Sequence, residues 1–241
     1  MRLIILFHFF LCTLVGFNTL QAQDLIRFQQ AHQVGYKNNN ESIIISPQYD
    51  AGSDFKDGIA LVVSNHKRGF INAAGEEFIP LKYEDASMFS EGLACVKFAG
   101  KYGYINRTGE WVIQPIFENA FSFKEGRARV QKNNLWGYIK QNGELIIPCI
   151  YNQAMDFSQG LAAVNLKELY GYIDGDGKTT IPFQYLMAMS FNASNEAIVA
   201  KDNVNYRTFV INKNGKILRE QEVFDEHRKE MEQEKREQEK R

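Results

Sequence analysis

The sequence predicts an all-β protein built as a tandem array of about five 34-residue units, each a three-stranded antiparallel β-meander. The first observation behind this prediction is a glycine that recurs every 34 residues, and the second is a phenylalanine that keeps the same interval. A fixed period in this range is typical of repeat architectures, in which one supersecondary unit stacks on its neighbours. The glycines are Gly69, Gly103, Gly137 and Gly171, and the phenylalanines are Phe55, Phe89, Phe123, Phe157 and Phe191.

The strands of one unit are clearest in the copy at residues 126–157. Residues 127–132 alternate between apolar and polar side chains, as a half-buried strand does. Asn133-Asn134 predicts a tight turn, and Gly143 predicts a second one, because glycine supplies the positive φ that a short hairpin needs. The strand after Gly143 ends at Pro148, which cannot donate a hydrogen bond to a ladder. The unit is therefore predicted to be a meander of three short strands.

The connector to the next unit has a different period. Tyr151, Ala154 and Phe157 recur every three residues, and Gly160 follows them. This spacing predicts a turn of 3₁₀- or α-helix that lays its apolar edge on the sheets, with Gly160 as its C-terminal cap. Packing between neighbouring units is then the expected source of stability.

Two motifs recur in each of the middle copies. One copy reads Gly-Leu-Ala-Cys-Val at 92–96 and Lys-Tyr-Gly-Tyr-Ile-Asn at 101–106, and another reads Gly-Leu-Ala-Ala-Val at 160–164 and Tyr-Gly-Tyr-Ile-Asp at 170–174. Trp136-Gly137 is the one literal Trp-Gly pair in the chain. Over about residues 34–218 the sequence resembles the WG-repeat family, also called KWG repeats. The resemblance implies a bacterial binding or scaffold module without an assigned catalytic centre.

The first and last copies depart from the pattern. Glu41 stands where the hairpin glycine of the first copy is expected, and Phe209 replaces the first glycine of the last copy. Degenerate end units are typical of capping repeats, whose outer faces meet water. We therefore expect an open, twisted array over residues 34–218, with residues 23–33 leading into it. A closed, five-bladed propeller-like ring is the alternative.

The N-terminus predicts export from the cell. Arg2 precedes an almost unbroken apolar run over residues 3–17, and polar residues then lead to Ala22, which is the pattern of a secretory signal peptide over residues 1–22. An uncleaved anchor is the alternative, although the run is shorter than the ~20 residues of a spanning helix. A lipoprotein is not favoured, because no small residues precede Cys12. We expect a periplasmic, envelope-associated or secreted protein with no integral membrane segment after cleavage.

Composition restricts the partners and the cross-links. A formal net charge of −1 provides no basic field for nucleic acid, so no nucleic-acid partner is expected. Cys95 and Cys149 occupy different phases of the repeat and are expected to be small apolar fillers rather than a disulfide. Residues 219–241 are rich in charge and poor in apolar side chains, which predicts a charged, helical or disordered tail.

No catalytic or metal-binding constellation is evident. The chain has no nucleophile elbow, zinc-binding helix motif or phosphate loop, so no catalytic residue, cofactor or metal is expected. The run from Asp174 to Gly177 resembles the start of a calcium loop, but it occupies the hairpin phase of the repeat, and a turn is favoured. The remaining polar residues considered have simple alternatives: His32, His66 and His227 are interpreted as surface histidines, and Asp57, Glu91 and Glu125 as a turn preference before the next glycine.

Four aromatic residues are the candidate partner-binding residues. Tyr102, Trp136 and Tyr170 share one phase of the repeat, so stacked units would align them along one surface. Trp111 stands at a phase where sibling units have Glu, Leu or Thr, so the core does not require an aromatic residue there. Such a stripe could stack on sugar rings or anchor a protein. The alternative is that these side chains cover the boundary between units.

These observations predict an exported, non-catalytic repeat protein that binds or scaffolds a protein or glycan partner. The alternative is an envelope or extracellular hydrolase with an unrecognised site, whose polar residues would converge in one cleft. A structural spacer that is joined to other components through the tail is a third hypothesis.

Overall fold

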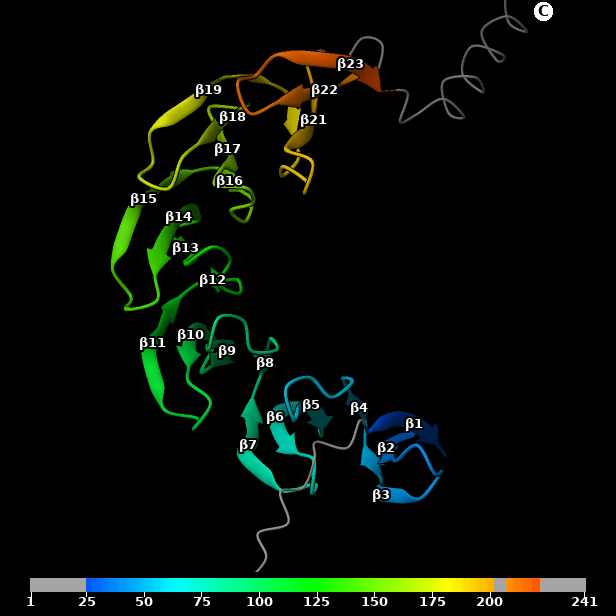
Figure 1. The fold of residues 1–241 in the computed structure, drawn as a ribbon. Coiled ribbons are helices and arrows are strands. Elements are labelled where there is room, and N and C mark those ends of the chain that lie inside the picture. The colour runs from blue at the N-terminus through cyan, green and yellow to red at the C-terminus, as the bar shows by residue number, and fades with distance from the viewer. Residues whose placement is uncertain (1–24, 202–206, 222–241) are drawn as a thin grey trace, which may run out of the picture.

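The computed structural model describes residues 25–201 and 207–221, and within these ranges the chain folds into six small antiparallel sheets. The sheets follow one another along an open arc whose two ends do not meet (Figure 1). The prediction of an all-β repeat protein is confirmed, because no helix occurs in the described ranges.

Each sheet is a meander of consecutive strands. The first sheet comprises β1 (Ile26–Gln30), β2 (Gln33–Lys37) and β3 (Ile43–Tyr49). The second comprises β4 (Ala51–Gly52), β5 (Ile59–Ser64), β6 (Lys67–Asn72) and β7 (Glu77–Tyr83), and the third β8 (Asp85–Ala86), β9 (Ala94–Phe98), β10 (Lys101–Ile105) and β11 (Trp111–Phe117). The fourth comprises β12 (Asn119–Ala120), β13 (Arg127–Lys132), β14 (Leu135–Lys140) and β15 (Leu145–Tyr151), and the fifth β16 (Gln153–Ala154), β17 (Ala162–Leu166), β18 (Leu169–Ile173) and β19 (Thr179–Tyr185). The sixth comprises β20 (Met187–Ala188), β21 (Glu196–Ala200), β22 (Thr208–Asn212) and β23 (Ile217–Gln221).

The predicted helical connector and the three-stranded unit are wrong. In the fifth sheet, Gln153 and Ala154 pair with Asn165 and Val164, so the connector supplies a short fourth strand instead of a helical turn. The segment then closes a two-residue turn at Gln159-Gly160, where both residues have positive φ (56° and 80°). The spacing of Tyr151, Ala154 and Phe157 therefore reflects a chain that crosses from one sheet to the next. Figure 1 shows these short strands on the inner side of the arc and the last strand of each sheet on the outer side.

The recurrent glycine of the Trp-Gly motif faces a bulge in the outer strand. Trp136 pairs with Tyr151 and Tyr138 pairs with Ile147, so three residues of β15, Pro148 among them, lie opposite Gly137 alone. A Cβ atom on Gly137 would come within 2.4 Å of the carbonyl oxygen of Ile147. The sixth sheet supports this explanation, because Phe209 replaces the glycine there and pairs with Glu220, and no bulge lies opposite Phe209.

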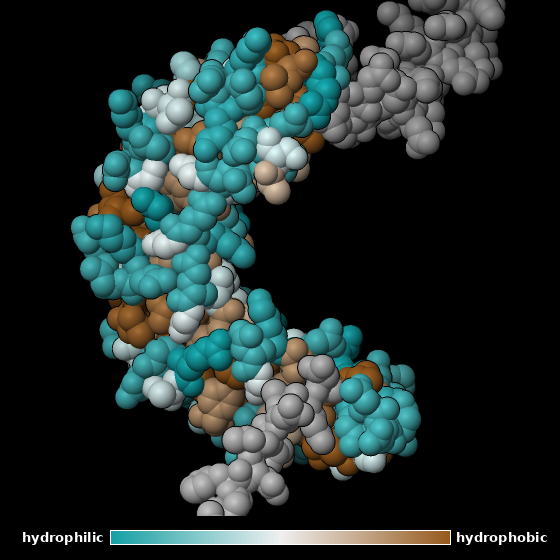
Figure 2. Space-filling view, viewed as in Figure 1, coloured by the Kyte–Doolittle hydropathy of each residue, from teal (hydrophilic) through white to brown (hydrophobic). Residues whose placement is uncertain are grey.

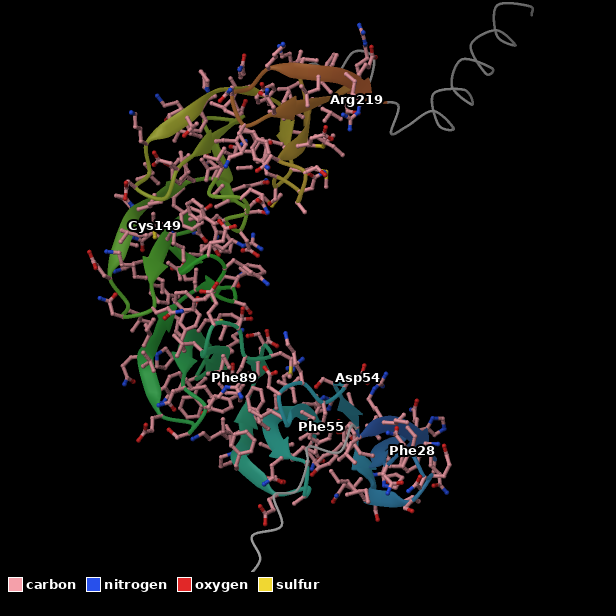
Figure 3. The ribbon with its side chains drawn as sticks, viewed as in Figure 1. Phe28, Asp54, Phe55, Phe89, Cys149 and Arg219 are labelled. Carbon is pink, nitrogen blue, oxygen red and sulfur yellow. The ribbon has the colours of Figure 1, made fainter. Side chains whose placement is uncertain are left out.

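Aromatic and small side chains fill the seams, by which we mean the interfaces between neighbouring sheets. In the seam between the fourth and fifth sheets, the rings of Tyr138 and Phe157 lie 4.8 Å apart, and the Tyr138 hydroxyl donates a 2.6 Å hydrogen bond to the carbonyl of Met155. The same contact recurs with 34-residue spacing, and Figure 3 shows Phe55 and Phe89 in the equivalent places between sheets. The core of this protein is therefore a series of clusters that are each shared by two sheets.

The two end sheets replace seam residues with charged ones. Lys37 stands at the phase of the buried Ile71 and covers the ring of Phe28, with its ammonium group 5.8 Å from the ring centroid. At the other end of the arc, Arg219 pairs with Glu196 through two hydrogen bonds of 2.9 and 2.6 Å. Phe28 and Arg219 mark these opposite ends in Figure 3. Charged outer faces of this kind are typical of capping units.

Strands lie at both ends of the described chain. Residues 26–30, which lie within the expected lead-in of residues 23–33, form β1 of the first sheet. The helical tail is not supported, because residues 219–221 belong to β23 and the remaining residues, 222–241, lie outside the described part. The predicted signal peptide, residues 1–22, also lies outside it.

Candidate binding site

The four candidate aromatic residues lie at the seams. Tyr102 and Trp136 are half-buried at the starts of β10 and β14, and Tyr170 is 9% exposed at the equivalent place in β18. Trp111 lies in another seam, between the second and third sheets, where its ring centroid is 6.0 Å from that of Tyr83. Tyr102, Trp136 and Tyr170 thus occupy equivalent places in three successive sheets, whereas Trp111 lies on a different strand of its sheet.

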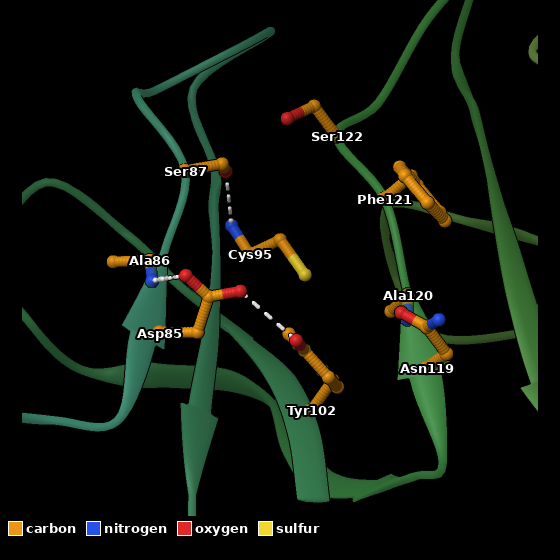
Figure 4. Close-up of a pocket in the computed structure, with 9 residues that line it drawn as sticks. All are labelled: Asp85, Ala86, Ser87, Cys95, Tyr102, Asn119, Ala120, Phe121 and Ser122. Atoms are coloured by element: carbon orange, nitrogen blue, oxygen red, sulfur yellow. Dashed lines mark hydrogen bonds between the residues drawn. The ribbon is translucent and has the colours of Figure 1, made fainter.

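A groove opens in the seam between the third and fourth sheets, next to Tyr102. It has a volume of about 360 Å³. The third sheet contributes Asp85, Ala86, Ser87, Cys95 and Tyr102 to its lining, and the fourth sheet contributes Asn119, Ala120, Phe121 and Ser122 (Figure 4). In this view the Cys95 thiol points across the groove towards the wall of the fourth sheet.

Hydrogen bonds fix the polar side of the groove. The Tyr102 hydroxyl donates a 2.9 Å hydrogen bond to the Asp85 carboxylate, and the backbone N–H of Ala86 donates to the other oxygen of that carboxylate at 2.9 Å. Arg68 in the second sheet adds an ion pair, with its Nε 3.5 Å from Asp85 Oδ1. The charge of the carboxylate is therefore largely compensated before any ligand arrives.

The far wall of the groove is held by stacking. The guanidinium of Arg129 lies 3.5 Å from the ring centroid of Phe121, and the Phe121 and Trp136 rings are 5.7 Å apart. Arg129 Nε is also 2.7 Å from an Asp156 oxygen. Phe121 nevertheless remains 37% exposed, so this ring is available at the edge of the groove.

Small side chains leave space for the groove in this seam. Ser87, Cys95 and Ser122 are small, and sibling seams carry a larger residue at one or more of these phases. Leu61 and Met88 pack against the core of the seam between the second and third sheets. In the seam between the fourth and fifth sheets, Arg129 stands at the position equivalent to Cys95. In the seam between the fifth and sixth sheets, Met155 stands at the position equivalent to Ser87. The sequence contained this signal, but only a comparison of three phases across neighbouring repeats reveals it.

Two ionisable side chains of the groove, Cys95 and Tyr102, have raised pKa values. Burial, reinforced by the nearby Asp85 carboxylate, raises the pKa of the Cys95 thiol to about 12. Burial and the hydrogen bond to Asp85 raise the pKa of the Tyr102 hydroxyl to about 12 as well. At neutral pH both groups are therefore protonated, and neither is a ready nucleophile or general base. Cys95 and Cys149 are both free thiols.

The repeated acids join neighbouring sheets. Glu125 adopts a positive φ of 51° in its turn, and its carboxylate accepts hydrogen bonds from the backbone N–H groups of Gln159 (2.7 Å) and Gly160 (2.8 Å) in the next sheet. Glu91 accepts a 2.9 Å hydrogen bond from the N–H of Gly126 in the same way. These acids therefore have a structural role across the seams as well as a place in the turn.

The calcium-like run is a hairpin turn in the structure. One oxygen of Asp174 accepts hydrogen bonds from the N–H groups of Asp176 (3.1 Å) and Lys178 (2.9 Å). The carbonyl of Gly175 accepts a 3.1 Å hydrogen bond from Arg127, whose guanidinium needs the space that a side chain at position 175 would fill. Within residues 25–201 and 207–221, no group of three or more His, Cys, Asp or Glu side chains is arranged to hold a metal ion.

The family assignment follows from the repeats. A family described as "WG containing repeat" matches residues 35–67, 69–102, 102–136, 136–170 and 170–204. The chain belongs to this family. The resemblance inferred from the sequence is confirmed, and each WG repeat spans parts of two successive sheets. No curated protein matches the chain.

Several solved structures with β-propeller-like folds are similar to parts of this chain. A crystal structure of a eukaryotic initiation factor has a TM-score of 0.54 and 10% identity, over 82% of this chain and 62% of that chain. Hsv2 of Kluyveromyces lactis has a TM-score of 0.49 and 11% identity, over 80% and 71%. BamB from Moraxella catarrhalis has a TM-score of 0.46 and 7% identity, over 83% and 70%. At these identities the likeness concerns the fold alone.

The surface of the WG repeats is mixed in character. Figure 2 shows a largely hydrophilic face on which apolar side chains form separate patches. Exposed apolar side chains occur on outer strands, for example Ile116 in β11 and Ile150 in β15. In the described ranges, no helix is both long and apolar enough to span a membrane.

Proposed function

We propose that this protein is an exported, non-catalytic binding module that holds a protein or glycan partner on the face that carries the groove. The observation that carries the proposal is the groove itself, an open seam of about 360 Å³ in a stack whose sibling seams carry larger side chains. Concave sites with an apolar lining and a few fixed polar groups are the usual binding sites of proteins. The predicted signal peptide supports export.

The state of the groove's titratable groups supports binding over catalysis. A hydrolase needs a nucleophile or base that is poised near neutral pH. Cys95 and Tyr102 have pKa values raised to about 12, and the Asp85 carboxylate is already engaged by Tyr102 and Arg68. We therefore assign these groups to shape and recognition.

The outer strands are less suited to recruiting a partner. Each of the first five sheets has a proline in its outer strand, opposite the recurrent glycine. Proline removes a donor, and a bulge twists the edge away, so these edges resist the addition of another strand. The face that carries the groove is therefore the better candidate for the partner-binding surface.

The test is capture of a partner from a cell-envelope extract by the immobilised chain without residues 1–22. Phe121→Ser installs the residue that the preceding repeat has at this phase, Ser87, and should abolish capture without unfolding the protein. The matched control is Ile150→Lys on an outer strand, which installs the sibling residue Lys82 and should leave capture unchanged.

Two results would contradict the proposal. If Phe121→Ser captures as much partner as Ile150→Lys, the face that carries the groove is not the binding surface. Loss of capture only after deletion of residues 222–241 would instead favour a spacer that is joined through its tail.

A further inference from the structure

We propose that the groove between the third and fourth sheets binds one ring of a neutral glycan, that is, a single uncharged, hydroxyl-bearing sugar unit. This inference rests on the proposed binding function and names the class of its ligand. Four features of the groove carry it: its size, its polar groups, its charge and the strands that border it.

The size of the groove suits a single ring. Its volume of about 360 Å³ lies at the lower end of the roughly 300–1,000 Å³ that small-molecule sites occupy. The lining combines apolar atoms of Ala86, Ala120 and Cys95 with two aromatic side chains, Tyr102 and Phe121. A sugar ring offers a matching surface, because its C–H groups form apolar faces and its hydroxyls project around the rim.

The polar groups of the groove suit hydroxyls. The Asp85 carboxylate can accept further hydrogen bonds, since each of its oxygens has more than one lone pair. Within the described residues, the amide nitrogen of Asn119 and the hydroxyl of Ser122 make no hydrogen bond to the protein. The groove therefore presents both acceptors and donors, which is what a hydroxyl requires, since it donates one hydrogen bond and accepts others.

The charge of the groove excludes strongly charged ligands. The lining contains one acidic side chain, Asp85, and no lysine, arginine or histidine, so it offers no cation to pair with a phosphate or a carboxylate. A cationic ligand gains little, because the guanidinium of Arg68 already lies 3.5 Å from Asp85. An uncharged ligand fits both facts.

The strands beside the groove do not favour a peptide. A peptide that adds to a sheet needs a free edge several residues long. The inner strands that border the groove, Asp85–Ala86 and Asn119–Ala120, have two residues each. A protein segment would therefore have to bind through one side chain alone.

The experiment is an NMR titration of the protein, labelled with ¹⁵N, with three uncharged probes: chitotriose, cellotriose and maltotriose. At least one probe should shift the amide signals of Ser87, Cys95 and residues 119–122 in a saturable way. Cys95→Leu and Ser122→Met install the sibling residues Leu61 and Met88 and fill the groove from opposite walls. Each should weaken binding at least tenfold.

The matched control is Cys149→Leu. It makes the same chemical change at the other cysteine, installs the sibling residue Leu81, and lies outside the groove lining. Its affinity should equal that of the unmodified chain. If Cys95→Leu fails to fold, Ser122→Met decides the question, because position 122 is only half-buried and has room for a longer side chain.

The remaining outcomes overturn the inference in distinguishable ways. Saturable shifts that survive both groove-filling variants would place the sugar elsewhere. No shift with any probe, together with capture of a protein that Ser122→Met abolishes, would make the groove a protein site and leave the proposed function intact. Failure of both the titration and the capture experiment would end both proposals.

Discussion

Replacing Gly137 with alanine tests why the repeat needs its central glycine. The added Cβ atom would lie 2.4 Å from the carbonyl oxygen of Ile147 and 2.7 Å from the backbone nitrogen of Cys149. Both contacts are with backbone atoms, so no side-chain rotation can relieve them. The bulge in β15 must move, and the pairing of Tyr138 with Ile147 must be strained or lost.

The expected change in the free energy of unfolding is the difference between two opposing contributions. Overpacking of a well-packed site costs about 1–3 kcal/mol, and the upper half applies here because backbone must shift. Alanine also makes the unfolded chain less flexible than glycine does, which stabilises the folded state by about 0.4–1 kcal/mol and offsets part of this cost. The expected net loss is therefore about 2 kcal/mol, which for a chain of this size lowers the melting temperature by roughly 4–8 °C.

Gly126→Ala is the matched control for this experiment. Gly126 has a positive φ of 75°, but a Cβ atom there would meet nothing within 4 Å. Its cost is the left-handed backbone alone, about 1–2 kcal/mol, less the same offset of about 0.4–1 kcal/mol. Thermal unfolding followed by circular dichroism compares the two variants. A melting temperature for Gly137→Ala at or above that of Gly126→Ala would refute the explanation by close approach.

Three further predictions concern the seams and the end of the arc. Tyr138→Phe removes the donor to the Met155 carbonyl and should cost about 1 kcal/mol in urea unfolding, and an unchanged midpoint would show that this hydrogen bond contributes nothing. Glu125→Ala should speed hydrogen exchange of the Gly160 amide, whereas equal exchange would argue against the contact between sheets. The hydrogen bonds from Arg219 hold the pKa of Glu196 below its ordinary value of 4.5, so the stabilisation is present above that pH and is lost as the pH falls through the lowered pKa. The stability difference between the unmodified chain and Glu196→Gln should therefore shrink in acid, and a difference that grows in acid would contradict this sign.

The repeat and most of its strands could be predicted from the sequence, because tight turns favour glycine and half-buried strands alternate. The prediction that the third strand ends at Pro148 is wrong, because β15 continues through this proline to Tyr151. The close approach at Gly137 and the bulge at Pro148 recur together, so the period revealed the length of the repeating unit but not the strand with which each sheet begins. The short strand at Gln153–Ala154 could not be recognised, because two residues are too few to show an alternating pattern. What fixes that strand is its pairing with β17, which is a contact between segments and leaves no local signal.

The candidate site was predictable only in part. Tyr102 could be selected because its phase in the repeat is periodic, and the structure places it beside the groove. The groove depends on an absence of bulk at positions 87, 95 and 122, which belong to two different sheets. A search for aromatic or charged residues misses such a feature, because small side chains are conspicuous only against their larger siblings.

The most direct test of the stacking of sheets is an NMR measurement of nuclear Overhauser effects between aromatic rings in adjacent sheets. The ring centroids of Tyr36 and Phe55, Tyr104 and Phe123, Tyr138 and Phe157, and Tyr172 and Phe191 lie 4.8 to 4.9 Å apart. A sample with protonated tyrosine and phenylalanine rings in a deuterated background should show all four contacts, repeated at the 34-residue interval of the sequence. Ring contacts that ignore this interval, or rings without any contact across the seams, would contradict the architecture.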